Sequence, residues 1–278
     1  MAEVTAQHGL LSDTQLHVED TGGPGRPVVL IHGWPLSSAS WKEQIPVLRD
    51  AGCRVVAYDR RGFGQSDKTL LGYSYDTLAS DLDRVLTELA LDDVTLVGFS
   101  MGGGEVARYV TNHGTARLHS VVFAAAVPPY MLKTSDNPDG PLEKSEAAKM
   151  AAQLTKDEAA FYDDFTTQFF SVDGELKVTE KQRQEALALT EQASKAAALE
   201  CMASFGSTDF REDLPNVTVP ALVIHGDSDG IVPIEGSGQR THEAIAQSQL
   251  TVIPGAPHGL NVSHTDQFNE ALLDFLAR

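Results

Sequence analysis

The chain has 278 residues, and its 42% hydrophobic and 22% charged residues are typical of a globular protein with one large domain or two small ones. A formal net charge of −18 argues against nucleic acid and against an anionic membrane surface as partners. The sequence contains no apolar run near the roughly 20 residues that span a bilayer, no visible secretory signal and only two cysteines, which lack metal-like spacing, so we expect a cytoplasmic protein.

The first 126 residues alternate between apolar runs typical of buried strands and segments typical of helices. Apolar, β-branched runs predict strands at 27–31, 54–58, 94–97 and 120–126. Helices are predicted around 41–50 and, from apolar residues at helical spacing, over 75–89 and 101–112. This alternation predicts a parallel sheet with helices on both faces.

The pattern changes after Pro128, where prolines and glycines break the chain into short, alanine-rich helical pieces without a strong strand. We predict that residues 128–215 form a helical cap and that 1–127 and 216–278 form the core domain. Phe161, Phe165 and Phe169 recur every four residues in the cap, so they share one helix face. That face either lines a substrate pocket or packs the cap against the core.

The core pattern resumes after the cap. Strands are predicted at 220–225 and 250–253, and helices at 235–247 and through the apolar residues of 268–276. Ile231 and Ile234, which follow the first of these strands, join Trp34, Pro35 and the three cap phenylalanines as predicted substrate-binding or pocket residues.

A Gly-x-Ser-x-Gly motif, Gly98-Phe99-Ser100-Met101-Gly102, lies between a predicted strand and a predicted helix. A serine at such a sharp turn exposes its hydroxyl, and the small residues at 98 and 102 let the two backbones approach. The alternative is a glycine-rich turn with an incidental serine. A base and an acid at suitable places decide between the two.

A serine nucleophile needs a base and a group that orients the base. His258 lies in a proline- and glycine-rich loop directly after the last predicted strand. Asp227 and Asp229 both lie in the loop after the strand that ends at His225, and the residues alone leave both open as the acid. Because the carboxyl ends of parallel strands meet at one edge of a sheet, these side chains can come close to Ser100.

Two backbone N–H groups are predicted to form an oxyanion hole. One belongs to Met101, the residue after the serine at the start of a helix. The other belongs to Trp34, in the loop after the first buried strand, since Pro35 has no N–H to donate.

Five segments together carry a resemblance to a known family: Trp34-Pro35, Tyr58-Asp59-Arg60-Arg61-Gly62-Phe63-Gly64-Gln65-Ser66, Gly98-Phe99-Ser100-Met101-Gly102-Gly103, His225-Gly226-Asp227-Ser228-Asp229 and Ala256-Pro257-His258-Gly259. The chain resembles, from about residue 16 to its end, the cofactor-free (non-heme) haloperoxidases and aryl esterases of the α/β-hydrolase superfamily. The resemblance implies a mostly parallel twisted sheet, helices on both faces and a helical cap insertion. It implies the catalytic residues Ser100, Asp229 and His258, and leaves His32 and His225 as structural residues at strand ends.

The same resemblance implies hydrolysis of small esters and perhydrolysis, in which hydrogen peroxide takes the acyl group and leaves as a peracid. The implied partners are a small ester or carboxylic acid plus water or hydrogen peroxide, with no cofactor and no metal; a homo-oligomer stays open. The Trp34-Pro35 pair resembles the perhydrolase-like members. We hypothesise that Pro35 aims the Trp34 carbonyl at an attacking peroxide, and the alternative is that Pro35 only stiffens the loop.

Other activities remain open on the same residues. A γ-lactamase or amidase, or a plain aryl esterase, would use the same three catalytic residues. A catalytically silent binding protein would be expected to lack one of them, and all three are present. A haloalkane dehalogenase or epoxide hydrolase would need an aspartate in place of Ser100.

Overall fold

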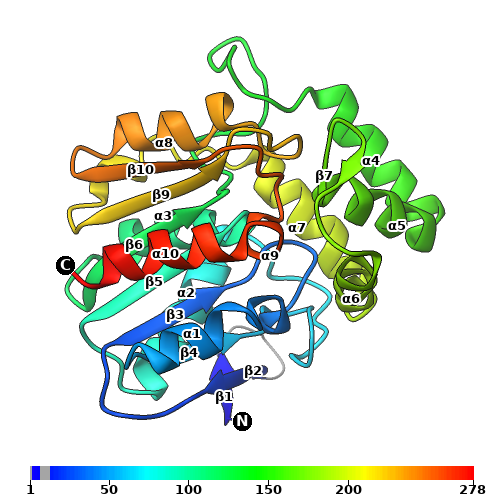
Figure 1. Ribbon diagram of the computed structural model, residues 1–278. Helices are drawn as coiled ribbons and strands as arrows, with labels where there is room; N and C mark the ends of the chain where they lie inside the picture. Colours follow the sequence, from blue (N-terminus) through cyan, green and yellow to red (C-terminus); the bar gives the residue numbers. More distant parts are fainter. Residues whose placement is uncertain (1, 7–12) are drawn as a thin grey trace.

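The computed structural model describes residues 2–6 and 13–278. Residues 1 and 7–12 lie outside the described residues, and they belong to the N-terminal segment in which no secretory signal is predicted. An eight-stranded sheet has the order β1-β2-β4-β3-β5-β6-β9-β10 (Figure 1). The strands are β1 (Ala2–Ala6), β2 (Thr14–Asp20), β3 (Pro27–Ile31), β4 (Arg54–Tyr58), β5 (Val94–Phe99), β6 (Leu118–Ala124), β9 (Ala221–Gly226) and β10 (Ser248–Ile253).

The sheet is parallel from β4 to β10, and the predicted α/β-hydrolase architecture is confirmed. The antiparallel pairs are β1 with β2 and β2 with β4. The sequence analysis did not predict these first two strands, because β2 contains charged residues and no continuous apolar run. Every residue of β5 is buried, as expected for a central strand that is covered on both faces.

Helices cover both faces of the sheet. On one face α1 contacts α10, and on the other α2 packs against α3 (Figure 1). The core helices are α1 (Gln44–Asp50), α2 (Tyr75–Glu88), α3 (Met101–His113), α8 (Gly238–Ala244), α9 (Leu260–Ser263) and α10 (Thr265–Leu276), with short 3₁₀ turns at η1 (Ser38–Trp41), η2 (Leu214–Asn216) and η3 (Ile234–Gly236). The helix predicted over 235–247 is therefore shorter than expected and is preceded by a 3₁₀ turn. None of the described helices is long and apolar enough to cross a membrane.

Four further helices form a separate layer beside the sheet (Figure 1). They are α4 (Lys144–Lys156), α5 (Glu158–Phe169), α6 (Glu180–Thr190) and α7 (Lys195–Ser207), with a small hairpin of β7 (Ser171–Val172) and β8 (Glu175–Leu176). All lie within the segment predicted to be the cap. Helix α4 packs against α5 and α7, and α5 packs against α6, so the helices support one another.

Candidate active site

Ser100 occupies the sharp turn between β5 and α3. Its φ of 54° is uncommon for a residue with a side chain. The Ser100 N–H donates to the carbonyl of Ala124 at 2.8 Å, which ties the turn to β6. A Cβ at Gly98 would lie 2.5 Å from the Gly102 carbonyl oxygen, and one at Gly102 would lie 2.6 Å from that of Ile31. Glycine at both positions therefore allows the close approach that brings the serine to the end of the strand.

Ser100, His258 and Asp229 form a continuous chain of hydrogen bonds. Ser100 Oγ lies 2.9 Å from His258 Nε2, and His258 Nδ1 lies 2.7 Å from Asp229 Oδ2. Asp227 does not take part: its Oδ1 accepts the N–H of Gly255 at 2.7 Å. The structure thus brings Asp229, and not Asp227, to the histidine.

The Asp229 carboxylate is held on both oxygens. Its Oδ1 accepts the backbone N–H groups of Ile231 at 2.9 Å and Val232 at 2.8 Å. His225 Nε2 lies 3.3 Å from Asp229 Oδ2 and 2.8 Å from the Val232 carbonyl oxygen. Since both neighbours accept hydrogen bonds, Nε2 must carry the hydrogen. His225, predicted to be only a structural strand-end residue, therefore also contacts the acid of the site.

The environment of Asp229 favours its ionised form. Burial raises the pKa of this carboxyl, but the charge of His258 and the hydrogen bonds from His225 and His258 outweigh burial, so its pKa lies well below the ordinary 3.8. An ionised carboxylate at this distance fixes the orientation of His258 and would stabilise its imidazolium form.

Two phenylalanines enclose the His258 ring. Phe99 packs at 5.3 Å between ring centroids, and Phe169 meets the ring edge-on at 5.1 Å. The N–H of Gly259 donates to the Phe169 carbonyl at 2.9 Å. Phe169 was predicted to bind substrate, but it is not among the cavity-lining residues and instead supports the histidine, because it is the last residue of α5 and faces the His258 loop.

A cavity of about 550 Å³ contains Ser100 and His258 at the junction of core and cap. Its apolar lining comes from both and includes Trp34, Val127, Met131, Met150, Phe161, Phe165, Met202, Phe205, Ile231 and Val232. Exposed polar residues of α4 and α5 also border it: Glu146, Lys149, Gln153, Lys156, Asp157, Asp164 and Gln168. The predicted pocket residues Phe161, Phe165 and Ile231 are in this lining. Pro35 and Ile234 are not in this lining; Ile234 is buried at the start of η3.

Trp34 joins the core to the cap. Its ring packs against Phe165 and Phe205 at centroid distances of 5.1 and 5.7 Å, and its Nε1 donates to the Ala198 carbonyl in α7 at 3.0 Å. Its backbone N–H has no hydrogen-bond acceptor within the part of the chain that the structure describes. Met101 is the first residue of α3, where backbone N–H groups have no carbonyl in a preceding turn. Both groups remain the predicted oxyanion donors.

A buried polar network holds the loop that contains Trp34. His32 Nδ1 donates to the Gly33 carbonyl at 2.9 Å, and His32 Nε2 accepts the N–H of Arg60 at 3.0 Å. The Arg60 guanidinium donates to the His32 carbonyl at 2.7 Å and forms an ion pair with Glu105 of α3. Burial and the Arg60 charge hold the pKa of His32 well below 6.5. The sequence analysis missed Glu105, whose only signal was an acidic residue among the small apolar ones of a predicted helix.

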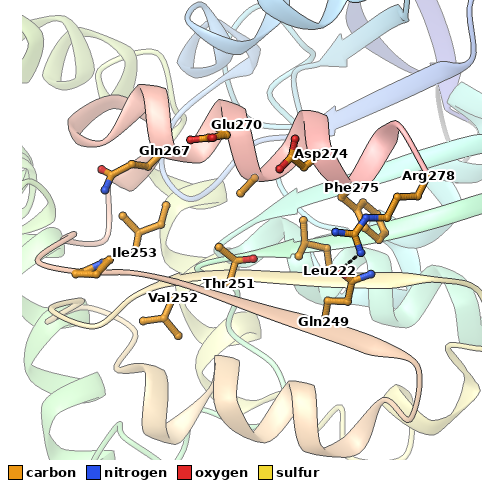
Figure 2. A pocket seen from close by; sticks show the side chains of 12 residues that line it. Leu222, Gln249, Thr251, Val252, Ile253, Gln267, Glu270, Asp274, Phe275 and Arg278 are labelled. Atoms are coloured by element: carbon orange, nitrogen blue, oxygen red, sulfur yellow. Dashed lines mark hydrogen bonds between the residues drawn. The ribbon is translucent and has the colours of Figure 1, made fainter.

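A second, smaller cavity of about 310 Å³ lies between β10 and α10. Figure 2 shows it bordered by Glu270 and Asp274 on the helix and by Gln249, which hydrogen-bonds to Arg278. None of its 12 lining residues is serine, cysteine or histidine. Among residues 2–6 and 13–278, no cluster of three or more His, Cys, Asp or Glu side chains could hold a metal ion.

Comparison with known proteins gives consistent matches over almost the whole length. A family model described as the alpha/beta hydrolase fold matches residues 26–265. The chain is 43% identical to the non-heme chloroperoxidase CPO-A1 of Kitasatospora aureofaciens, over 91% of this chain and 93% of that protein. It is 35% identical to a bifunctional esterase/perhydrolase of Acinetobacter calcoaceticus, with 99% of each covered. The crystal structure of a bromoperoxidase from Bacillus anthracis is similar with a TM-score of 0.96 and 48% identity, over 100% of this chain and 99% of that one.

Proposed function

The chain belongs to the alpha/beta hydrolase fold family, among the non-heme haloperoxidases, and on this premise we propose a serine esterase and perhydrolase that acts through Ser100, His258 and Asp229. The observation that carries the proposal is the unbroken hydrogen-bond chain from Ser100 Oγ through His258 to Asp229, which opens into the cavity. The likeness to a bifunctional esterase/perhydrolase supports both activities.

In the first half-reaction, Ser100 Oγ attacks the ester carbonyl carbon while its proton moves to His258 Nε2. The N–H groups of Trp34 and Met101 donate to the oxyanion that forms. The tetrahedral intermediate then collapses, the C–O bond to the alcohol breaks, and His258 returns the proton to the departing oxygen. The product is an acyl ester of Ser100. With a carboxylic acid as acyl donor, the departing group is water.

In the second half-reaction, His258 takes a proton from an acceptor molecule whose oxygen attacks the acyl carbon. Water gives the carboxylic acid, and hydrogen peroxide gives the peracid. Peroxide keeps a second O–H after attack begins, so a nearby carbonyl that accepts this hydrogen favours peroxide over water. We assign this role to the carbonyl of Trp34, whose conformation is restricted by Pro35.

The cavity supports a short acyl group. Trp34, Phe161 and Phe165 line the same cavity as Ser100, and exposed polar residues of α4 and α5 also border it. Small carboxylic esters and short carboxylic acids fit a site of this size and polarity.

The decisive experiment follows aryl acetate hydrolysis by wild type and Ser100→Ala while hydrogen peroxide is titrated in, with phenol and peracid measured together. We expect turnover by the wild type alone, with peracid rising at low peroxide. Serine-independent turnover, or none at all, would contradict the proposal. Hydrolysis without peracid would leave a plain esterase.

Pro35→Leu tests the choice between peroxide and water. We expect the ratio of peracid to carboxylic acid to fall, because leucine relaxes the conformational restriction that Pro35 places on Trp34. An unchanged ratio would show that Pro35 only stiffens the loop. The ratio is measured within one reaction, so a general loss of activity does not affect it.

A further inference from the structure

Three methionines line the cavity that contains Ser100. They are Met131, Met150 and Met202, from three separate segments of the chain. Met131 and Met202 are only 4% and 6% exposed, so the cavity is their main route to solutes. Met101, next to the serine, is fully buried and is not part of the lining. The described residues therefore include methionines that line the cavity and one, Met101, that does not.

We propose that Met131 and Met202 are self-modification sites, oxidised to sulfoxides by the peracid that the enzyme forms in this cavity. The inference rests on the proposed perhydrolase function. A peracid is an electrophilic oxygen donor, and a thioether is the side chain that most readily accepts an oxygen atom without first losing a proton. Neither Ser100 nor His258 is consumed by this reaction.

The step balances without a further reactant. A sulfur lone pair attacks the terminal peroxide oxygen of the peracid, and the O–O bond breaks. The proton of the terminal oxygen passes to the departing carboxylate, which leaves as the carboxylic acid. Sulfur is oxidised by two electrons to the sulfoxide, and the peracid is reduced to its parent acid, which can acylate Ser100 again. Hydrogen peroxide is the oxidant consumed overall.

Confinement makes the cavity methionines preferred targets. One molecule in a space of about 550 Å³ corresponds to a local concentration on the order of molar. A peracid released from the acyl ester of Ser100 is initially present at this local concentration, whereas peracid in bulk solution is far more dilute. Met131 and Met202 should therefore react during product release, before Met150, which is half-buried and more open to the bulk.

The modification would change the pocket. A sulfoxide oxygen is a strong hydrogen-bond acceptor, and the neighbouring lining residues Trp34, Phe165 and Phe205 present rings to the cavity. An apolar acyl group then binds beside a polar group, which is unfavourable. Peroxide turnover would thus lower the activity of the enzyme progressively, and a methionine sulfoxide reductase would restore it.

The test places both oxidant sources in one vessel. Unlabelled wild type and ¹⁵N-labelled Ser100→Ala are mixed in equal amounts with acetate and hydrogen peroxide, and the reaction is stopped with catalase and free methionine. Mass spectrometry then measures sulfoxide in each methionine peptide for both isotopes. Because the two proteins share the same bulk peracid, a difference between them reports peracid made inside the cavity. His258→Gln serves as a second inactive protein in case Ser100→Ala does not fold, and thermal unfolding checks both.

We expect Met131 and Met202 to be oxidised about tenfold faster in the wild type than in the inactive variant, with a ratio near one at Met101. Omitting acetate should bring all ratios to one. Equal oxidation of both isotopes while peracid accumulates would overturn the inference and leave the perhydrolase function intact. Absence of peracid from the vessel would overturn the function and this inference together.

Discussion

At the scale of single residues, the Asp229 carboxylate receives hydrogen bonds from two backbone N–H groups and from two imidazoles, those of His225 and His258. His225 Nδ1 is buried without a partner among the described residues, so the ring is held through Nε2 alone. This arrangement leaves Asp229 little rotational freedom and fixes which oxygen faces His258. The site is therefore pre-organised by contacts that lie outside the three proposed catalytic residues.

Asp229→Asn should lower kcat for aryl acetate by about 10⁴-fold, because an amide no longer holds His258 in the required tautomer. Asp227→Asn is the matched control, two residues away in the same loop. We expect it to keep most of the activity, since its carboxylate contacts Gly255 and not the histidine. Steady-state kinetics of both variants measure this. A larger loss in Asp227→Asn would show that the wrong aspartate has been assigned.

The lowered pKa of Asp229 also predicts how stability depends on pH. A carboxyl whose pKa is lower in the folded state than its ordinary 3.8 adds stability above that value and loses it as the pH falls toward the folded pKa. The difference in unfolding free energy between wild type and Asp229→Asn should shrink as the pH falls below about pH 4. Urea unfolding at a series of acidic pH values measures it, and a difference that grows as the pH falls below about pH 4 would be the opposite sign.

At the scale of elements, helix α5 divides its phenylalanine face between two tasks. Phe161 and Phe165 line the cavity, and Phe169 packs against the ring of His258. The four-residue spacing was enough to place all three on one helix face. It did not tell which end of that face meets the core, because the cap helices take their orientation from contacts with Trp34 and the His258 loop.

Phe169→Ala should lower kcat about tenfold and destabilise the fold by about 3 kcal/mol, because it leaves a hole behind His258. Phe161→Ala, one end of the same helix face, should instead raise KM with a smaller effect on kcat, since it removes cavity lining. Kinetics and urea unfolding of the pair separate the two roles. Equal KM effects in both variants would contradict the division.

At the scale of the whole molecule, Arg60 and Glu105 connect three elements around the site. Arg60 follows β4, its guanidinium contacts the carbonyl of His32 after β3, and Glu105 belongs to the helix that begins after Ser100. Tyr58 donates a further hydrogen bond to Glu105 at 2.7 Å. Both charged side chains are almost completely buried, so neither can exchange its partner for water.

Glu105→Gln should lower the unfolding free energy by about 3 kcal/mol, because it leaves the buried Arg60 charge without its counter-charge. Glu143→Gln, which removes one side of the exposed ion pair with Lys133, should cost less than about 1 kcal/mol. Chemical denaturation of both variants at neutral pH provides the comparison. A similar, small effect in both would show that the buried pair contributes no more than a surface one.

The sequence by itself determined the alternation of strands and helices from 27 to 126, the turn at Ser100 and the position of His258 in a loop after a strand. These features depend on short-range periodicity and on turn residues such as Gly98 and Gly102, which act within a few residues of themselves. Only the family resemblance, and not spacing, favoured Asp229 over Asp227.

Tertiary structure decided the features that depend on where side chains from distant segments meet. It brought Asp229 and His225 together beside His258, turned Phe169 from the cavity to the histidine, and placed Met131 and Met202 in the lining. Ser100, Asp229 and His258 are separated by tens of residues in the chain, and no local pattern records that they touch. The location of the site at the carboxyl ends of the parallel strands was predictable, because it follows from the topology of the sheet. The contacts between side chains at that edge of the sheet follow from packing.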